Sequence, residues 1–224
     1  MSLRGICSRR EADVYIKKGC VFVDGEKITT LGTKVSPQSK ITLIAREKKI
    51  SIALFKPLGY VSTQPEKGYL TAVDLLPKKH HRKLSPCGRL DIDSQGLLLF
   101  SQDGRVAKAI IGETTEMEKE YIVTFTTNPS EEQLEKLRFG ILLEEKQLKP
   151  AKIKPINKSQ ISMTLTEGKN RQIRRMARVV GLTVKGIKRM RIGPIDLGTL
   201  KSGEWRYLEN DELIKLAPSL REDQ

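Results

Sequence analysis

The apolar and polar positions of this chain first describe a short helix near its N-terminus. Ser8 and Glu11 form a capping box, in which the serine hydroxyl and the glutamate carboxylate each accept a backbone amide of the other residue. Ala12, Tyr15 and Ile16 follow at helical spacing. Because glycine readily takes the left-handed conformation that ends helices, Gly19 is a natural stop. The pattern predicts a helix from Ser8 to about Gly19.

A small β structure follows this helix. Val21 to Val23 is a strand candidate, and Asp24-Gly25 directly after it is typical of a two-residue hairpin turn. So short a segment holds only a small core, and a polar stretch succeeds it. We therefore predict an N-terminal module over residues 1–45, a linker over 46–49 and a second domain over 50–224.

The second domain mixes strands and helices without a strict alternation. Leu97 to Phe100 is an unbroken apolar run typical of a strand buried on both faces, whereas Ile161 to Thr166 alternates like a half-buried strand. Further strands are predicted at Ile50 to Phe55, Tyr60 to Ser62 and Tyr121 to Thr126, and helices at Arg105 to Ile111, Ser130 to about Phe139 and about Asn170 to Val180. These elements predict an α+β fold with a mostly antiparallel sheet flanked by helices.

The last of these helices carries two stripes. The apolar stripe is Ile173, Met176, Ala177 and Val180, and the basic stripe is Arg171, Arg174, Arg175 and Arg178. Both follow the helical i, i+3, i+4, i+7 spacing, so one face packs inward while the other presents guanidinium groups. Guanidinium groups pair with successive phosphates, and one of them can also pair with a buried carboxylate.

Composition limits the class of protein. The chain has 224 residues, 38% of them hydrophobic, and 41 Lys and Arg against 27 Asp and Glu give a formal net charge of +14. No apolar run approaches the roughly 18–20 residues of a membrane span and no signal peptide opens the chain, so we expect a soluble, cytoplasmic protein. The chain has three cysteines, an odd number without a CxxC pair, so we expect no disulfide framework. Its two histidines are adjacent in a basic run, so we expect no structural zinc site or other metal.

The basic residues concentrate in two runs. Residues 168–191 hold nine of them and residues 77–89 hold five, and neither run contains an acid. A membrane-surface helix would set large apolar residues opposite its lysines, whereas aromatic residues here total 5% and do not gather beside either run. Nucleic acid is therefore the favoured partner, although a charged run can also be simply a solvated surface.

Carboxylates are the main candidates for chemistry. Asp91 and Asp93 lie in the glycine-bounded loop from Gly88 to Gly96, directly before the apolar strand. At the mouth of a buried strand an ionised acid needs a nearby cation, and Arg174 is one candidate. Two alternatives remain: the aspartates cap turns in a surface loop, or they form a magnesium pair, which no third acidic cluster supports.

Several motifs resemble one enzyme family. Gly88-Arg89-Leu90-Asp91, with Ser94 to Leu98 behind it, is similar to the signature of the RsuA/RluB/RluE/RluF pseudouridine synthases. Further matches are Lys56 to Thr63, Lys119 to Tyr121, Glu167 to Met176 and Gly203 to Arg206, which together span nearly the whole chain. Residues 170–176 most resemble the RluF type, whose substrate is a uridine of large-subunit (23S) ribosomal RNA.

The N-terminal module resembles a second family. Ser8 to Asp13, Gly19 and Val23 to Gly25 are similar to the αL RNA-binding module first described in a small-subunit ribosomal protein, S-four. In that family a helix precedes the equivalent of Gly5. Only Met1 to Arg4 stand there in this sequence, so we expect the first helix of the module to be missing.

The resemblance implies an isomerase that flips a uridine out of the RNA and needs no cofactor. It makes Asp91 the catalytic aspartate, acting as base or nucleophile, Tyr121 the residue in contact with the uracil, and Arg174 the partner of the aspartate. Leu98 and Ile173 are expected to pack the pocket.

RNA contacts follow from the same resemblance and from the charge pattern. Arg89 is expected where the target nucleotide leaves the stack, and the other predicted RNA-binding residues are Arg9, Arg10, Lys17, Lys18, Arg171, Arg175, Arg178, Lys185, Lys188 and Arg189. We expect a monomer acting on ribosomal RNA or its assembly intermediate. Transfer RNA as the substrate and a non-catalytic assembly factor are the alternatives, and the sequence does not identify the target uridine.

Overall fold

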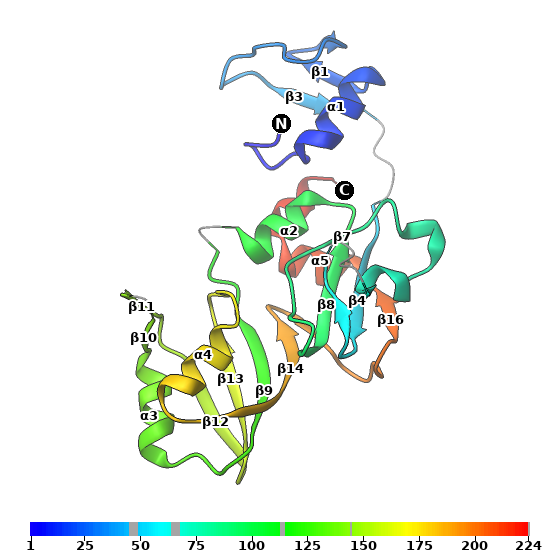
Figure 1. Ribbon diagram of the computed structural model, residues 1–224. Coiled ribbons are helices and arrows are strands. Elements are labelled where there is room, and N and C mark those ends of the chain that lie inside the picture. The colour runs from blue at the N-terminus through cyan, green and yellow to red at the C-terminus, as the bar shows by residue number, and fades with distance from the viewer. Residues whose placement is uncertain (45–48, 64–67, 113–114, 144, 224) are drawn as a thin grey trace.

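The computed structural model describes residues 1–44, 49–63, 68–112, 115–143 and 145–223. A small helix-and-sheet module lies at one end of the molecule, next to the C-terminus, and a large mixed sheet with flanking helices forms the rest (Figure 1). Within these described ranges, no helix combines the length and apolar character that crossing a bilayer demands.

The module has the predicted local structure. Helix α1 (Arg9–Lys17) begins at Ser8, whose hydroxyl accepts from the Glu11 amide while the Glu11 carboxylate accepts from the Ser8 amide at 2.8 Å. A three-stranded sheet in the order β2-β1-β3 follows, formed by β1 (Val21–Val23), β2 (Glu26–Ile28) and β3 (Ile41–Leu43). The capping box and the hairpin are thus confirmed, and residues 1–8 form turns rather than a helix.

One long sheet organises the second domain. Its strands run in the order β12-β13-β9-β14-β8-β4-β16, and β15 and β7 add to β14 and β8. The bounds are β4 (Ser51–Lys56), β7 (Ser85–Pro86), β8 (Gln95–Ser101), β9 (Lys119–Phe125), β12 (Lys152–Asn157), β13 (Gln160–Leu165), β14 (Val184–Ile192), β15 (Ile195–Asp196) and β16 (Trp205–Tyr207). Neighbours pair antiparallel except β14 with β8, so the predicted α+β class and mostly antiparallel sheet are confirmed.

Helices cover both faces of this sheet. They are α2 (Gly104–Ile111), α3 (Glu131–Phe139), α4 (Gln172–Val179) and α5 (Asn210–Leu216), with short 3-10 turns η1 (Ala72–Leu75), η2 (Lys78–His80) and η3 (Pro218–Asp223). Two small ribbons complete the fold: β5 (Tyr60–Val61) with β6 (Leu70–Thr71), and β10 (Leu142–Leu143) with β11 (Lys146–Gln147). The sequence pattern predicted α2, α3 and α4 but not α5, and it missed β12, β14 and β16.

The apolar run in β8 serves two cores. Leu97 and Leu99 pack on one face of the sheet with residues of α2 and α5, whereas Leu98 and Phe100 pack on the other face with residues of α3 and α4. A strand covered on both faces needs no alternation, which explains the unbroken Leu97–Phe100 sequence.

The parallel contact between β8 and β14 requires glycine. Gly96 lies opposite Arg189 and has a φ of +110°, and a Cβ atom there would lie 2.3 Å from the Arg189 carbonyl oxygen. Only a residue without a side chain permits this approach. The joint therefore fixes how the two halves of the long sheet meet.

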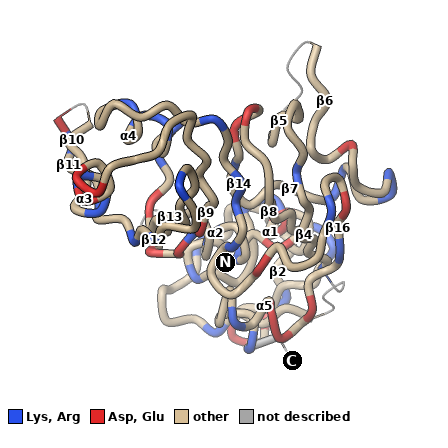
Figure 2. The backbone as a smooth tube through the Cα atoms, turned by 90° about the horizontal axis from the view of Figure 1, so that it is seen from below, with Lys and Arg blue, Asp and Glu red and all other residues tan. Residues whose placement is uncertain are grey.

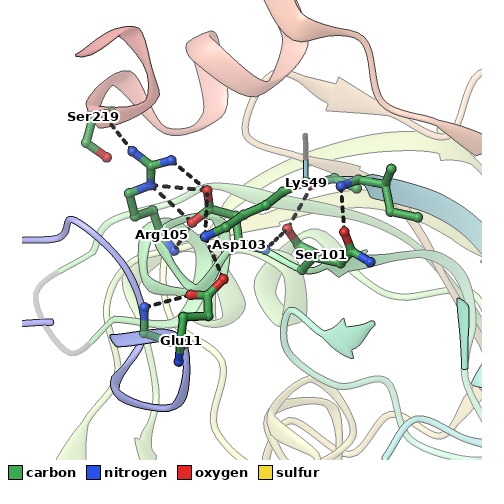
Figure 3. Close-up of polar contacts among 10 residues, drawn as sticks. Glu11, Lys49, Ser101, Asp103, Arg105 and Ser219 are labelled. Atoms are coloured by element: carbon green, nitrogen blue, oxygen red, sulfur yellow. Dashed lines mark hydrogen bonds and ion pairs between the residues drawn. The ribbon is translucent and has the colours of Figure 1, made fainter. Parts of the chain in front are cut away.

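Two helix N-termini meet where the module contacts the second domain (Figure 3). Glu11 in the first turn of α1 and Asp103 at the N-cap of α2 share Lys49, whose Nζ lies 2.6 Å from Glu11 Oε1 and 3.6 Å from Asp103 Oδ2. Arg105 also holds Asp103, at 2.7 Å. Each carboxylate offsets the positive end of its helix, and the lysine joins the pair. Lys49 is the described end of the predicted 46–49 linker, and residues 46–48 lie outside the described residues.

Burial works against ionisation of Asp103, but its hydrogen bonds from Arg105 and the charge of Lys49 outweigh this and lower its pKa. Asp103 is thus an anion around neutral pH. A buried anion with these partners is a fixed anchor for the module.

Replacing Gly96 by alanine should destabilise the protein by more than about 4 kcal/mol, because the new methyl group would overlap the backbone of β14. Gly203→Ala is the matched control, since Gly203 also has a positive φ, +85°, but nothing within 4 Å of an added Cβ. It should cost only about 1–2 kcal/mol of backbone strain. Urea unfolding measures both, and equal losses would contradict the close-approach argument.

Replacing Glu11 by glutamine should loosen the module. Glutamine can still complete the capping box, but it loses the charge that holds Lys49, a contact worth about 1.5–3 kcal/mol. Small-angle X-ray scattering should show a larger radius of gyration for this variant, whereas Asp13→Asn, an exposed change on the same helix, should leave the curve unchanged. Superimposable curves for all three proteins would refute the anchor.

Candidate active site

A cavity of about 690 Å³ opens beside the parallel contact between β8 and β14, where the two halves of the long sheet meet. It is lined by the loop before β8, by β9 and β14, and by the loop before α4. Asp91, Tyr121, Arg171, Ile173 and Arg189 all contribute to its wall. The structure thus gathers residues that are far apart in the sequence around one space of a size typical for a small-molecule site.

The Asp91 backbone is tethered on both sides. Before it, the Ser62 hydroxyl donates to the Leu90 carbonyl at 2.7 Å and accepts from the Leu90 amide at 2.9 Å. After it, the Gly59 amide donates to the Ile92 carbonyl at 2.9 Å. The 56–63 segment therefore holds the aspartate in place, which gives that motif a structural reason.

Tyr121 lies on strand β9, which lines the same cavity. It is a β9 residue paired with Arg189 of β14 and with Met163 of β13, and only 8% of it is exposed. Its ring lines the cavity from within the core. Tyr121 is thus set to contact a flat group bound there.

Gln172 shapes the loop that brings Arg171 to the cavity. Its buried side chain donates to Glu167 Oε1 at 2.8 Å and accepts from the Lys169 amide at 2.9 Å. Arg171 follows this folded loop in the left-handed region, with φ +46°, as the residue that begins α4. Arg171 at this turn lies within 4.0 Å of Asp91, whereas Arg174 further along the helix reaches Asp93.

The predicted pairing of Arg174 with Asp91 is wrong in this structure. Arg174 donates to the Asp93 carbonyl at 2.8 Å and to the Val184 carbonyl at 3.2 Å, and its Nε lies 3.2 Å from the Asp93 carboxylate. Arg171 lies 4.0 Å from Asp91 and 2.8 Å from Asp93. Arg174 is one turn further into α4, where it spans the second aspartate and the start of β14 and contributes nothing to the cavity wall described here.

The electrostatics of Asp93 follow from these contacts. Partial burial opposes its ionisation, but the hydrogen bond from Arg171 and the charges of Arg174 and Arg171 outweigh burial and lower its pKa. Asp93 is therefore a fixed anion that holds both arginines beside the loop.

Three buried cations belong to the surroundings of the site: Lys119 and Arg189 line the cavity, and Lys56 interacts electrostatically with Arg189 and Asp91. Lys56, Lys119 and Arg189 are 0%, 8% and 3% exposed. Burial and then the charge of Arg189 lower the pKa of Lys56 to about 8, against the opposite effect of Asp91 and Asp93, and the same two causes lower the pKa of Lys119. Lys56 donates to the carbonyls of Pro57 and Tyr60, which closes the turn at the start of the 56–63 segment. Sequence patterning gave no signal for this cluster.

The remaining predicted residues divide into several groups. Arg89 is exposed and lines the cavity, and Ile173 lines it from the core. Leu98 is completely buried in the core and is not a wall residue, which corrects its prediction as pocket packing. Arg189 is a second correction, because its burial removes it from the accessible phosphate contacts.

Other predicted RNA contacts lie on the surface. Exposed side chains are those of Arg9, Arg10, Lys17, Lys18, Arg178 and Lys185, whereas Arg175 and Lys188 are half-buried. Lys188 Nζ lies 5.0 Å from the centre of the Phe55 ring. Figure 2 shows Lys and Arg positions spread over several elements, with a stretch along β14. The exposed residues named above accordingly come from several elements, among them α1, α4 and β14.

Asp91 is the best candidate nucleophile or base of the described cavity wall. The other carboxylate, Glu167, accepts hydrogen bonds from Gln172 and from the Lys149 amide. Burial raises the pKa of the Cys87 thiol to about 12, so the thiol stays protonated and unreactive. The Asp91 side chain is one-third exposed. Among the described residues its one ion pair is the 4.0 Å contact with Arg171.

Comparison with known proteins gives consistent matches. The profile of the RNA pseudouridylate synthase family matches residues 50–178, and that of the S4 domain matches residues 1–41. The dual-specificity RNA pseudouridine synthase RluF of Escherichia coli K12 is 38% identical over 96% of this chain and 76% of its own length. The ribosomal large subunit pseudouridine synthase B of Bacillus subtilis is 36% identical over 95% of this chain and 91% of its own.

A crystal structure of a pseudouridylate synthase is similar in fold. It superposes with a TM-score of 0.72 at 30% sequence identity and covers 93% of this chain and 94% of its own. The similarity therefore extends through the module and the second domain.

Replacing Lys56 by methionine should change how stability depends on pH. The pKa of Lys56 is about 8 in the folded protein against its ordinary 10.5, so the unfolded chain binds more protons between these values. Relative to the variant, the wild-type free energy of unfolding should rise over that pH range, by up to about 3 kcal/mol at about 1.4 kcal/mol per pKa unit. Urea unfolding from pH 7 to 11 tests this, and a constant difference between the two proteins would contradict it.

Proposed function

This chain belongs to the RNA pseudouridylate synthase family, and on that premise we propose that it modifies a uridine of large-subunit ribosomal RNA, with Asp91 as its catalytic residue. The family gives the reaction class: an isomerase that converts uridine in RNA to pseudouridine. The choice of ribosomal RNA is supported by the Bacillus subtilis relative, whose name refers to the large ribosomal subunit. Cytoplasm, where ribosomes assemble, is the corresponding location.

The observation that carries the assignment is the position of Asp91. Its backbone is tethered through Leu90 and Ile92, and it lines the same cavity as Tyr121. A uridine inside a stacked helix cannot reach this cavity, so the nucleotide must flip out at a cost of a few kcal/mol. Exposed Arg89 at the cavity mouth is suited to fill the vacated place in the stack.

The reaction breaks the bond between ribose C1′ and uracil N1 and rejoins the base through C5. Asp91 either removes the C2′ proton or adds to C1′ as the base departs. The uracil then turns against Tyr121, and C5 bonds to C1′ as the Asp91–C1′ bond breaks or as a proton returns to C2′. The C5 proton is then lost and N1 gains a proton. The product is an isomer of the substrate and neither route uses an external oxidant or reductant, so the proposed reaction calls for no cofactor.

The two arginines place positive charge beside the two aspartates. Arg171 lies near both aspartates, whereas Arg174 contacts Asp93 through its carbonyl and its carboxylate. Arg171 therefore acts on Asp91 directly, and Arg174 acts through Asp93 as a positioning residue. All of these groups come from one chain, so we expect a monomer to suffice.

The module and the basic surface supply RNA affinity. Exposed Arg9, Arg10 and Lys17 lie on α1, and Arg178 and Lys185 lie on α4 and β14. Pairing with phosphates at these positions offsets the cost of flipping and makes binding salt-dependent. Splayed bases in a loop or bulge would provide the sequence specificity.

Carbodiimide mapping of pseudouridine in unmodified large-subunit RNA tests this function. Wild type should convert a uridine, and Asp91→Asn should lower the rate by at least about 10²–10⁴-fold because the amide is neither a base nor a nucleophile. Asp196→Asn, an exposed change on β15, should keep full activity.

Equal pseudouridine content with wild type and Asp91→Asn would refute the catalytic assignment. Conversion of transfer RNA but not ribosomal RNA would refute ribosomal RNA as the substrate, while the proposed catalytic role of Asp91 would stand. Salt-dependent RNA binding without conversion by either protein would favour a non-catalytic assembly factor.

A further inference from the structure

Arg189 has one guanidinium nitrogen to spare inside the cavity wall. Its Nε donates to the Leu97 carbonyl at 2.7 Å, and one terminal nitrogen donates to the Arg89 carbonyl at 3.2 Å. The other terminal nitrogen is buried and has no hydrogen-bond partner over the described residues. A residue that is 97% buried thus retains an unused donor, and this residue lines the same cavity as Asp91 and pairs with Tyr121 in the sheet.

Two other arginines that are buried or half-buried, Arg105 and Arg191, have carboxylate partners. Arg105 is paired with Asp103, and Arg191, two residues along the same strand, is paired with Glu118 and Glu120. Arg189 has no carboxylate within 4.0 Å in the described parts of the chain, and its two partners are neutral carbonyls. A buried cation without a counter-charge is costly, so its retention points to a negative charge supplied by a ligand.

The surroundings of Arg189 add to this excess of positive charge. Lys56 and Lys119 are also buried, and the charge of Arg189 lowers the pKa of both. The cations therefore repel one another inside the folded protein. Such a wall is preorganised for a group that becomes negative during a reaction.

We propose that Arg189 is a further catalytic residue, whose free N–H donates to a carbonyl oxygen of the uracil and stabilises that base as it leaves the ribose. This inference rests on the proposed function. When the C1′–N1 bond breaks, its electron pair goes to the uracil, which becomes an anion with charge on its ring nitrogen and carbonyl oxygens. If Asp91 acts as nucleophile, an Asp91–C1′ bond forms. If it acts as base, it takes the C2′ proton and a C1′=C2′ bond forms. The base leaves as an anion by either route.

The geometry around Arg189 suits this task. Arg89 and Leu97 bracket the loop that carries Asp91, so the arginine is fixed by both ends of that loop. Tyr121 lies directly across the strand pair from Arg189. The backbone contacts of Arg189 therefore connect it to the loop of Asp91 and to the strand of Tyr121. A donor that does not have to reorganise during the reaction stabilises developing charge most effectively.

Tritium release tests the proposal. Large-subunit RNA labelled with tritium at uridine C5 loses that label when pseudouridine forms, so single-turnover release with excess enzyme gives the rate. Arg189→Met, which removes the charge at similar length, should lower the rate by about 10²–10³-fold with RNA affinity within about twofold of wild type. Arg189→Lys keeps the positive charge but loses the branched guanidinium donors, so its rate should lie between those of wild type and Arg189→Met.

Arg191→Met is the matched control, because it removes a carboxylate-paired arginine from the same strand. It should retain a rate close to wild type. Circular dichroism checks the fold of each variant. If Arg189→Met does not fold, Arg189→Lys carries the test, and a Lys variant as fast as wild type overturns the proposal.

A second substrate separates stabilisation of the base from a structural role. Fluorine at uracil C5 withdraws charge and makes the base a better leaving group, so the deficit of the Arg189 variants should shrink about tenfold or more on 5-fluorouridine RNA, measured by chromatography of the digested nucleosides. Equal deficits on both RNAs, or full activity of Arg189→Met, overturn the proposal. A wild type that releases no tritium contradicts the proposed function instead.

Discussion

The backbone contact between Gly96 and Arg189 is the constraint on which the rest of the second domain depends. At this point β8 and β14 run parallel in a sheet that is otherwise antiparallel, and the glycine has no Cβ to keep them apart. On one side of this contact, β4 and β16 continue the sheet from β8. On the other side, β9, β13 and β12 continue it from β14. The cavity lies at this joint, so the aspartate loop, the Tyr121 strand and the buried arginine meet because the strands can approach.

The basic charge of the chain, from 41 Lys and Arg against 27 Asp and Glu, serves several purposes that the composition does not distinguish. Part of it is exposed on α1 and β14, where it can meet phosphates. Part of it neutralises carboxylates: Lys49 joins Glu11 to Asp103, and Arg171 and Arg174 hold Asp93. A third part is buried without an acidic partner, and this part provides the field inside the cavity.

Local signals in the sequence predicted local structure. The capping box at Ser8 predicted the start of α1, since both halves of the box lie within one turn. The predicted start of α3 at Ser130 is also confirmed, and there the structure has a capping box with Gln133. The motif that carries Asp91 also predicted the family, and Asp91 is the catalytic residue that we propose on that basis. The strand β14 was not predicted, because its alternating burial is hidden among basic residues that read as a nucleic-acid surface, and its parallel pairing is non-local. Helical spacing could not tell Arg171 from Arg174 either, since a left-handed residue at the start of α4 decides which one reaches Asp91.

The central claim is that a flipped uridine binds at this joint, with its ribose at Asp91 and its base at Arg189. A crystal structure of the enzyme with a large-subunit RNA fragment carrying 5-fluorouridine at the mapped position tests it most directly, because that base cannot lose a C5 proton. The account predicts the modified nucleotide in the cavity, with an Asp91 oxygen near the ribose and the free Arg189 nitrogen about 3 Å from a base carbonyl oxygen. A nucleotide bound outside the cavity, or a base that turns its carbonyl oxygens away from Arg189, would contradict it.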